Sequence, residues 1–239
     1  EDLSDVLIAT PPSTHAEIAT AFVEKGIPVF VEKPMTTSVP EARTLQASAK
    51  RTDTMCMVGF EYLFNDYISY LKTEIEAGKF GTIIKVESEH IVSPSRADVD
   101  IFWDAGAHPL SIFECLFHPK NIVNLQGEIT HDSAALEITF EHAPILCMKM
   151  SCLGTTKTRK LTITGEKATA VLDETLEKNK LAIIKDGKTL YPEIDARKPL
   201  QTELEHFLNC IETGEKPLSD VNVGYRVTEL LETISKKVK

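Results

Sequence analysis

Short apolar runs alternate with amphipathic stretches through the first 60 residues. Residues 6–9, 28–31 and 54–59 are almost entirely apolar, which is typical of fully buried parallel strands. Between them, residues 15–25 and about 39–51 place apolar side chains at helical spacing. Two consecutive strand–helix–strand units are therefore expected, which make the C-terminal half of a Rossmann-type doubly wound parallel sheet.

The pattern changes after Gly81, where apolar and polar positions begin to alternate in short segments separated by turn residues. The spacing is too short for crossover helices, so a large, mostly antiparallel open sheet is expected. Its strands are predicted at residues 82–92, 122–129, 136–140, 145–150, 161–164, 168–172, 181–184 and 189–194. Helices are predicted at residues 66–77, 107–117, 200–212 and 221–237.

These patterns predict an α/β domain followed by an α+β domain. Residues 1–60 form a partial dinucleotide-binding domain in this interpretation, and residues 61–239 form an α/β substrate-binding and oligomerisation domain. Since few helices are available to cover so many strands, one apolar face of the large sheet is expected to stay exposed. Self-association through that face, giving a homo-oligomer, is the corresponding prediction.

Composition narrows the function classes. The chain has 239 residues, of which 42% are hydrophobic, and 26 basic against 36 acidic residues give a net charge of −10. This balance argues against a nucleic-acid partner held by phosphate contacts, and no apolar run approaches the length of a membrane span. The five cysteines lack metal-ligand spacing and suit a reducing compartment, so a cytoplasmic protein without a metal is expected.

Two polar segments are candidates for chemistry. An apolar strand ends on Glu32-Lys33-Pro34, which delivers a lysine to the carboxyl edge of the sheet, where open α/β sheets bind ligands. In the segment Phe102–His108, Asp104 and His108 are four residues apart and share a face if the segment is helical. A lysine, a carboxylate and a histidine suffice for proton transfer, and no glycine-rich phosphate loop occurs in the chain.

Four motifs occur here in the order and spacing of a known family. They are Ile8-Ala-Thr-Pro-Pro-Ser-Thr-His15, Phe30-Val-Glu-Lys-Pro34, Met57-Val-Gly-Phe60 and Trp103-Asp-x-x-x-His108. The chain thus resembles the glucose-fructose oxidoreductase / inositol dehydrogenase family over essentially its whole length. The resemblance implies a Rossmann domain that binds NAD or NADP and a second domain whose open sheet is often used for oligomerisation.

The resemblance also implies site residues. Catalytic roles fall on Lys33, Asp104 and His108. The cofactor site is assigned to Thr10, Pro11, His15, Glu32 and Lys33, and the substrate site to Lys33, Tyr62, Trp103 and His108. Lys33, Asp104 and His108 are expected to converge on one cleft, and the Lys33–Pro34 bond is expected to be cis, as the family tends to have it.

The chain departs from the family's pattern in three places. The glycine-rich motif and the acidic residue that reads the ribose would lie before Glu1, so the N-terminal part of the Rossmann domain is expected upstream. The choice between NAD and NADP therefore stays open. Glu61 and Leu63 stand where many members carry Asn and Arg, and Ser111 stands where many carry Asp. These changes weaken any inference of a specific sugar.

Each candidate also has a plainer interpretation. His108, with a reference pKa near neutrality, suits the proton of a substrate hydroxyl, but a histidine near a helix start can simply cap or pack. Asp104 could orient that imidazole or serve as the N-cap of the helix that follows. Lys33 could stabilise developing negative charge on the substrate oxygen or remain a solvated lysine. Trp103 and His15 are more often packing residues.

The sequence thus favours an NAD(P)-dependent oxidoreductase that acts on a sugar, a cyclitol or a related polyol. The alternative is a non-catalytic binding or regulatory member of the same fold, because fold does not fix function. A bare oligomerisation domain is the third possibility. The joint presence of Lys33, Asp104 and His108 favours the enzyme.

Overall fold

A computed structural model describes residues 3–92 and 100–238 of the chain. These residues divide into two compact units. The first comprises residues 1–65 and 197–233, and the second comprises residues 66–196 and 234–239. The boundary expected after residue 60 lies close to the end of the first segment of unit one, at residue 65. The sequence-based division assigned residues 197–233 to the C-terminal domain, whereas in the structure they belong to the first unit.

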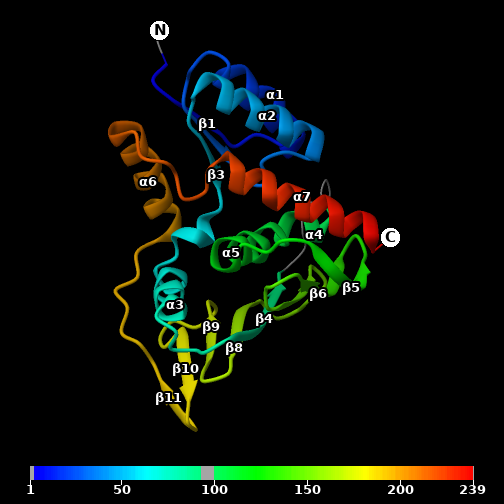
Figure 1. Cartoon of the computed structure of the whole chain (residues 1–239), viewed down its shortest axis with the longest axis vertical. Helices are drawn as coiled ribbons and strands as arrows, with labels where there is room; N and C mark the ends of the chain where they lie inside the picture. The colour runs from blue at the N-terminus through cyan, green and yellow to red at the C-terminus, as the bar shows by residue number, and fades with distance from the viewer. Residues whose placement is uncertain (1–2, 93–99, 239) are drawn as a thin grey trace. The chain divides into compact units, whose positions relative to one another are not determined.

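The first unit is built on a three-stranded parallel sheet in the order β1-β2-β3. The strands are β1 (Val6–Ile8), β2 (Val29–Glu32) and β3 (Cys56–Gly59), and they are joined by α1 (Pro12–Val23) and α2 (Val39–Thr52). The two helices lie side by side (Figure 1). β2 is central and its Val29, Phe30 and Val31 are buried, as its continuous apolar run predicts. The strand–helix–strand repeat expected from the sequence is confirmed.

The start of α1 differs from the expectation. The helix begins at Pro12, with Pro11 as the preceding residue and no side chain capping it, rather than near His15. Proline suits the first helical position, because its missing N–H would be unpaired there and its ring already holds a helical φ. Position 12 can therefore start the helix without a capping side chain.

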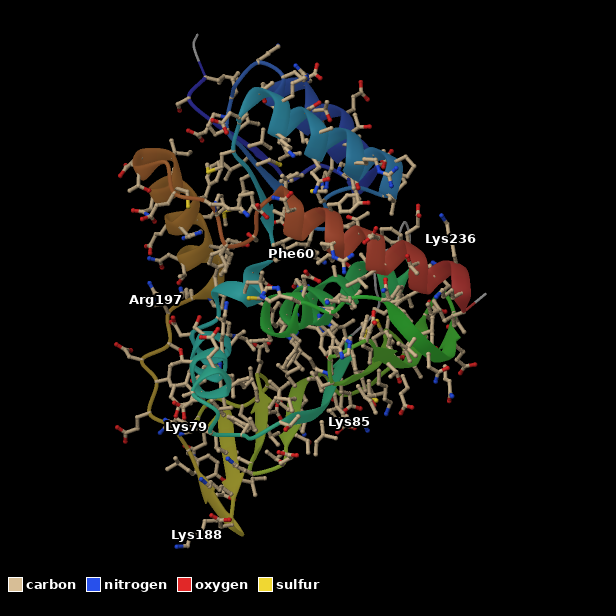
Figure 2. The ribbon with its side chains drawn as sticks, viewed as in Figure 1. Phe60, Lys79, Lys85, Lys188, Arg197 and Lys236 are labelled. Carbon is tan, nitrogen blue, oxygen red and sulfur yellow. The ribbon has the colours of Figure 1, made fainter. Side chains whose placement is uncertain are left out.

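The C-terminal segment completes the first unit. α6 (Pro199–Thr213) and α7 (Val221–Lys237) follow one another, and the stretch between them pairs with β3. The backbone N–H of Val58 donates to the carbonyl of Ser219 at 2.8 Å. Phe60, which follows β3, leads into a short 3-10 helix, η1 (Glu61–Phe64), that the sequence pattern did not predict (Figure 2).

The second unit contains an eight-stranded sheet in the order β11-β10-β9-β8-β4-β7-β6-β5. Its strands are β4 (Ile83–Ile91), β5 (Ile122–Ile129), β6 (Ser133–Phe140), β7 (Ile145–Ser151), β8 (Thr158–Gly165), β9 (Thr169–Asp173), β10 (Leu181–Lys185) and β11 (Lys188–Leu190). β4 and β7 pair in parallel, and every other pair of neighbours is antiparallel. The mostly antiparallel open sheet is therefore confirmed.

Three helices accompany this sheet: α3 (Asp66–Glu76), α4 (Ile101–Ala105) and α5 (Ala107–Phe117). Phe113 of α5 packs on Phe140 of β6, with ring centroids 5.1 Å apart. β6 and β7 alternate strictly, so that Leu146 and Met148 are buried while Lys149 is exposed. The alternation gives the sheet one apolar face, covered by helix, and one polar face. Lys188 lies at the tip of the β10–β11 hairpin (Figure 2).

The polar face overturns the reason given for self-association. Instead of an exposed apolar surface, this face carries Lys85, Glu87, Glu89, Glu137, Lys149, Lys160 and Thr162. Three ion pairs cross it, at 2.8 Å between Lys85 and Glu87, 3.2 Å between Lys149 and Glu89, and 3.3 Å between Lys160 and Asp173. The outward positions of β4, β7 and β8 are mostly polar, whereas Ile184 of β10 is 41% exposed.

Candidate functional site

The carboxyl edge of the small sheet gathers the N-terminal candidates. β1, β2 and β3 run parallel, so the segments that follow them emerge at the same edge. Thr10 is exposed after β1, and Lys33 is half-buried directly after β2. The backbone N–H of Lys33 donates to Oε2 of Glu32 at 3.2 Å. The Lys33–Pro34 bond is cis, as expected.

His15 lies behind this edge rather than on it. Its side chain is 1% exposed and its two ring nitrogens lie 2.9 Å from the carbonyl oxygen of Pro34 and 2.8 Å from that of Thr10. His15 is therefore packed near the start of α1, and its assignment to the cofactor site stays a prediction. Its ring also joins the two segments assigned to the cofactor site.

A carboxyl cluster that the sequence interpretation missed lies within the first unit. Glu203 of α6 is 1% exposed, and neither of its carboxyl oxygens has a hydrogen-bond partner among the described residues. Burial, together with Glu32 and Glu61, raises the pKa of Glu203 to about 9. Burial also raises the pKa of Glu32, with a further contribution from Glu61 that Lys33 and His15 oppose. Glu203 therefore carries a proton at neutral pH.

A signal for Glu203 was present in the sequence. Glu203, Phe207 and Cys210 lie at i, i+4 and i+7 of α6, and all three are buried. A glutamate on the apolar stripe of a helix is unusual, because burying a carboxylate costs free energy unless it is neutralised or paired. Helical periodicity would thus have singled it out.

Asp104 and His108 lie on adjoining helices of the second unit. Gly106 joins α4 to α5 with helical dihedrals, φ −68° and ψ −24°, so the expected one-turn spacing of the two side chains holds. A Cβ at position 106 would collide with the carbonyl oxygen of Phe102. Glycine is therefore required for this close joint.

The N-cap interpretation of Asp104 is wrong. α4 is capped by Asp100, whose carboxylate accepts the backbone N–H of Trp103 at 2.9 Å, and α5 follows Gly106 without a side-chain cap. Asp104 lies inside α4, because the helical segment starts earlier than the sequence pattern indicated. Its carboxylate is therefore not committed to a helix start.

The ring of His108 stacks on the ring of His90 from β4. Their centroids are 6.1 Å apart and their planes differ by 20°. No pattern in the sequence predicts this pairing. Ser111, which replaces the family's Asp, donates from its hydroxyl to the backbone carbonyl of His108 at 2.8 Å. This bond fixes the first turn of α5, on which His108 is half-buried.

The remaining candidates differ in exposure. Tyr62 is buried in η1, and Trp103 is half-buried in α4. Lys33 and Tyr62 belong to the first unit, whereas Trp103, Asp104 and His108 belong to the second. Convergence of Lys33 with Asp104 and His108 therefore stays a prediction.

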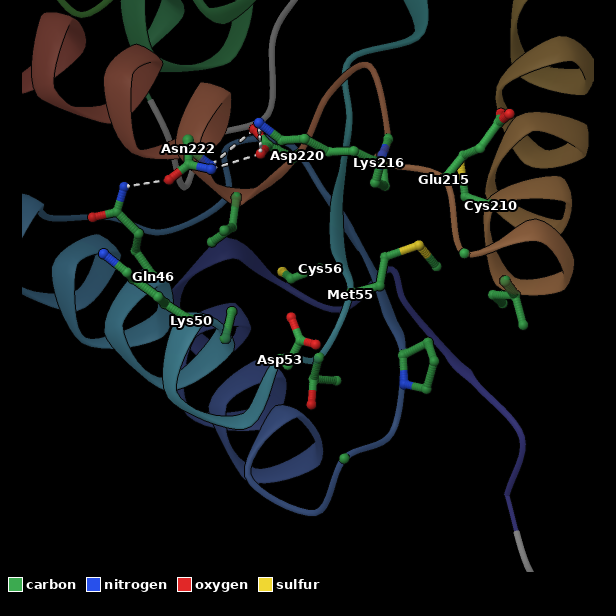
Figure 3. A pocket seen from close by; sticks show the side chains of 18 residues that line it. Gln46, Lys50, Asp53, Met55, Cys56, Cys210, Glu215, Lys216, Asp220 and Asn222 are labelled. Atoms are coloured by element: carbon green, nitrogen blue, oxygen red, sulfur yellow. Dashed lines mark hydrogen bonds and ion pairs between the residues drawn. The ribbon is translucent and has the colours of Figure 1, made fainter.

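A pocket of about 760 Å³ lies at the opposite edge of the small sheet (Figure 3). It is lined by the amino ends of β2 and β3, the C-terminal parts of α2 and α6, and the start of α7. Asp220 closes one side: its carboxylate accepts the backbone N–H of Asn222 at 3.0 Å and pairs with Lys216 at 2.8 Å. These polar groups satisfy one another, and the pocket is not at the edge that holds Lys33.

Among the residues that the structure describes, no group of three histidine, cysteine or acidic side chains could hold a metal ion. No helix within residues 3–92 and 100–238 is long and apolar enough to cross a membrane. All five cysteines are free.

Comparison with known proteins agrees with this architecture. A family model described as "Oxidoreductase family, NAD-binding Rossmann fold" matches residues 1–60. Scyllo-inositol 2-dehydrogenase (NAD(+)) of Bacillus subtilis is 38% identical over 76 residues, which cover 32% of this chain and 22% of that protein. UDP-N-acetylglucosamine 3-dehydrogenase of Acidithiobacillus ferrooxidans is 26% identical over 95% of this chain and 76% of its own length.

Solved structures show the same fold. The A. ferrooxidans dehydrogenase superposes with a TM-score of 0.89 over 98% of this chain and 78% of its own, at 24% identity. An inositol dehydrogenase homologue from Azotobacter vinelandii, complexed with NADH and myo-inositol, gives a TM-score of 0.83 at 20% identity over 98% of this chain and 76% of its own.

The chain spans only part of its curated relatives. The alignments cover 22%, 33% and 35% of the lengths of three inositol dehydrogenases. The family model matches the part of the chain that holds the parallel three-stranded sheet, and the solved structures agree with the fold as a whole. Residues 1–60 match the oxidoreductase family with an NAD-binding Rossmann fold, and the chain as a whole has the fold of the A. ferrooxidans dehydrogenase.

Proposed function

We propose that the protein containing this chain is an NAD(P)-dependent oxidoreductase that transfers a hydride between a nicotinamide cofactor and a hydroxyl carbon of a sugar, a cyclitol or a related polyol. The observation that carries the proposal is the place of Lys33, half-buried at the carboxyl end of the central strand of a parallel sheet. Relatives named as inositol and sugar-nucleotide dehydrogenases support the substrate class.

The residues at this edge fit one side of a dinucleotide. Thr10 is exposed and carries a hydroxyl group, and it follows the strand next to the one that ends at Lys33. This position suits contact with the nicotinamide half of the dinucleotide. Pro11 and Pro12 lack backbone N–H groups, so the start of α1 is a poor phosphate site. The pyrophosphate would be held elsewhere, and the assignment of Thr10, Pro11, Glu32 and Lys33 concerns the nicotinamide side alone.

The chemistry divides between three side chains in this proposal. The bound nicotinamide supplies hydride acceptance. His108 accepts the hydroxyl proton as general base, and Lys33 donates a hydrogen bond to the same oxygen and stabilises its developing negative charge. Asp104, one helical turn before His108, orients the imidazole and stabilises it once it is protonated. Trp103 and Tyr62 are proposed to shape the substrate side of the site.

The test uses the complete product of the gene that encodes this chain. NADH formation is followed with scyllo-inositol, myo-inositol and UDP-N-acetylglucosamine as substrates. His108→Ala is expected to lower turnover by roughly 10²- to 10⁴-fold, the usual scale for a lost general base, with cofactor affinity nearly unchanged. His142→Asn is the matched control, because His142 is exposed at φ 58°, a backbone conformation that Asn tolerates.

Lys33→Met is expected to reduce turnover by about 10²- to 10³-fold, the scale seen on loss of one oxyanion donor. If both variants keep full activity, the catalytic assignment is wrong. If the wild type binds NADH but oxidises no polyol, the non-catalytic alternative replaces the enzyme.

Self-association through the open sheet is retained as a proposal on different grounds. The ion pairs of Lys85, Lys149 and Lys160 would make such an interface polar and therefore sensitive to salt. Sedimentation at low and high NaCl measures this, and a monomer under both conditions contradicts it. A cytoplasmic location is likewise inferred, and five free cysteines support a reducing compartment.

A further inference from the structure

The two ring nitrogens of His15 both face backbone carbonyl oxygens. Nδ1 lies 2.9 Å from the oxygen of Pro34, and Nε2 lies 2.8 Å from the oxygen of Thr10. The side chain is 1% exposed, so water does not replace either partner. Each distance is typical of an N–H···O hydrogen bond.

Carbonyl oxygens accept hydrogen bonds and cannot donate them. A neutral imidazole carries one N–H, so it can satisfy only one of two carbonyl groups. The lone pair of its other nitrogen would then face the lone pairs of a carbonyl oxygen inside a buried site, which is unfavourable. A ring with N–H groups on both nitrogens satisfies both contacts.

The charges around His15 agree with a cationic ring. Glu32 at the end of β2 interacts favourably with His15. Lys33, the next residue, is the nearby positive group, and Glu61 of η1 and Glu203 of α6 act on Glu32 from the other elements. Glu32 is thus a carboxyl group whose electrostatic interaction with His15 favours the charged form of both.

The clamp connects the two segments on which the proposed chemistry depends. Thr10 follows β1 on the side assigned to the cofactor, and Pro34 follows Lys33 directly. On the other side of Lys33, its backbone N–H is held by Glu32. The backbone of Lys33 is therefore restrained on both sides, once through Glu32 and once through His15.

We propose that His15 is a positioning residue which, with both ring nitrogens protonated, bridges the carbonyl groups of Thr10 and Pro34 and so fixes the Lys33 turn beside the cofactor segment. This positioning role rests on the proposed function, whereas the two N–H groups of the clamp are measurable without any activity. His15 touches neither cofactor nor substrate in this proposal.

A second histidine of the same unit, the half-buried His206, provides an internal comparison. Nε2 of His206 accepts the backbone N–H of Leu218 at 3.1 Å, a contact that requires an unprotonated nitrogen. Burial lowers the pKa of His206. The two rings are thus expected to differ in proton count at the same pH.

Nitrogen-15 NMR of the histidine side chains in the 239-residue chain at pH 7 tests the clamp. Two protonated, slowly exchanging ring nitrogens are expected for His15, and one protonated and one bare nitrogen for His206. Signals are assigned by their loss in His15→Gln and His206→Gln. A bare nitrogen on His15 at pH 7 overturns the inference and leaves the proposed function intact.

Turnover of the complete gene product tests the positioning role. His15→Gln places one amide donor where the ring has two, and it is expected to lower kcat by about tenfold to a hundredfold, the cost of misplacing a catalytic group. KM for the polyol should change little, and His206→Gln should retain kcat per bound NADH. An unchanged kcat in His15→Gln refutes the positioning role, whereas an unchanged turnover in Lys33→Met refutes the proposed function.

Discussion

The ring of Phe207 on α6 meets the ring of Phe30 on β2 edge to face, with centroids 5.7 Å apart and planes inclined by 69°. Phe30 is 3% exposed and Phe207 1%. This contact joins the central strand of the N-terminal sheet to a helix from the far end of the chain. It explains why residues 197–233 belong to the first unit.

Truncation of this contact should destabilise the first unit. Phe207→Ala is expected to lower the free energy of unfolding by about 3–5 kcal/mol, the range for a buried phenylalanine. Hydrogen exchange of the β2 amides should accelerate accordingly. Leu208→Ala is the control on the same helix, because Leu208 is 51% exposed, and its effect should stay within about 0.5 kcal/mol. Equal effects of the two variants would refute the assigned contact.

Gly224 of α7 marks a close approach between elements. A Cβ there would lie 2.7 Å from Cγ2 of Val58 and closer still to Sδ of Met35. Gly224→Ala should therefore destabilise the chain by about 1–3 kcal/mol through overpacking, although alanine favours the helix by about 1 kcal/mol. Urea denaturation measures the change.

Shortening Met35 provides the check on this reasoning. In a double-mutant cycle, Met35→Ala combined with Gly224→Ala should cost less than the sum of the two single changes, since the space removed at one position is refilled at the other. If the two changes in unfolding free energy simply add, the overpacking caused by Gly224→Ala does not involve Met35.

Glu203 should make stability depend on pH. Its pKa is raised in the fold from 4.5 to about 9, so the folded chain binds a proton between these values that the unfolded chain has released. The contribution is therefore fully present below pH 4.5 and is lost as the pH rises toward 9, by at most roughly 1.4 kcal/mol per pH unit. Glu203→Gln removes this slope and should be the more stable form at pH 8.

Denaturation of both proteins between pH 5 and pH 8 measures this slope. Glu205→Gln serves as the control, because Glu205 is exposed on the same helix and should leave the slope as it is. A Glu203→Gln variant with the wild-type pH dependence would show that Glu203 is ionised in the folded chain.

Most elements could be predicted because their signals are local. The continuous apolar run at Val29–Val31 predicts a buried parallel strand, and residues 145–150 are predicted to form a strand of the second sheet. Both predictions are confirmed. The predictions of helix starts and of short elements failed. The start of α1 depends on proline, and the start of α4 depends on the cap at Asp100. The short helix η1 depends on the path of the chain after β3.

The polar face of the large sheet shows the same limit. The strands were predicted correctly from the sequence. The number of predicted helices was too small to cover them, and from this an exposed apolar face was inferred. In the structure the burial of β7 alternates, and Lys149 lies on the second face. The inference of an exposed apolar face relied on the number of strands. Whether the uncovered face is apolar depends instead on the polarity of the side chains at its outward positions.

The sequence by itself determined the motifs, the order of the elements and the placement of Lys33 at a strand end, because these depend on neighbours in the chain. Tertiary structure decided that α6 and α7 complete the first unit, that His108 stacks on His90, and that Glu203 and His15 are buried among distant partners. The physical reason is that burial and hydrogen-bond partners are set by residues far away in the chain, and a local pattern holds no record of them.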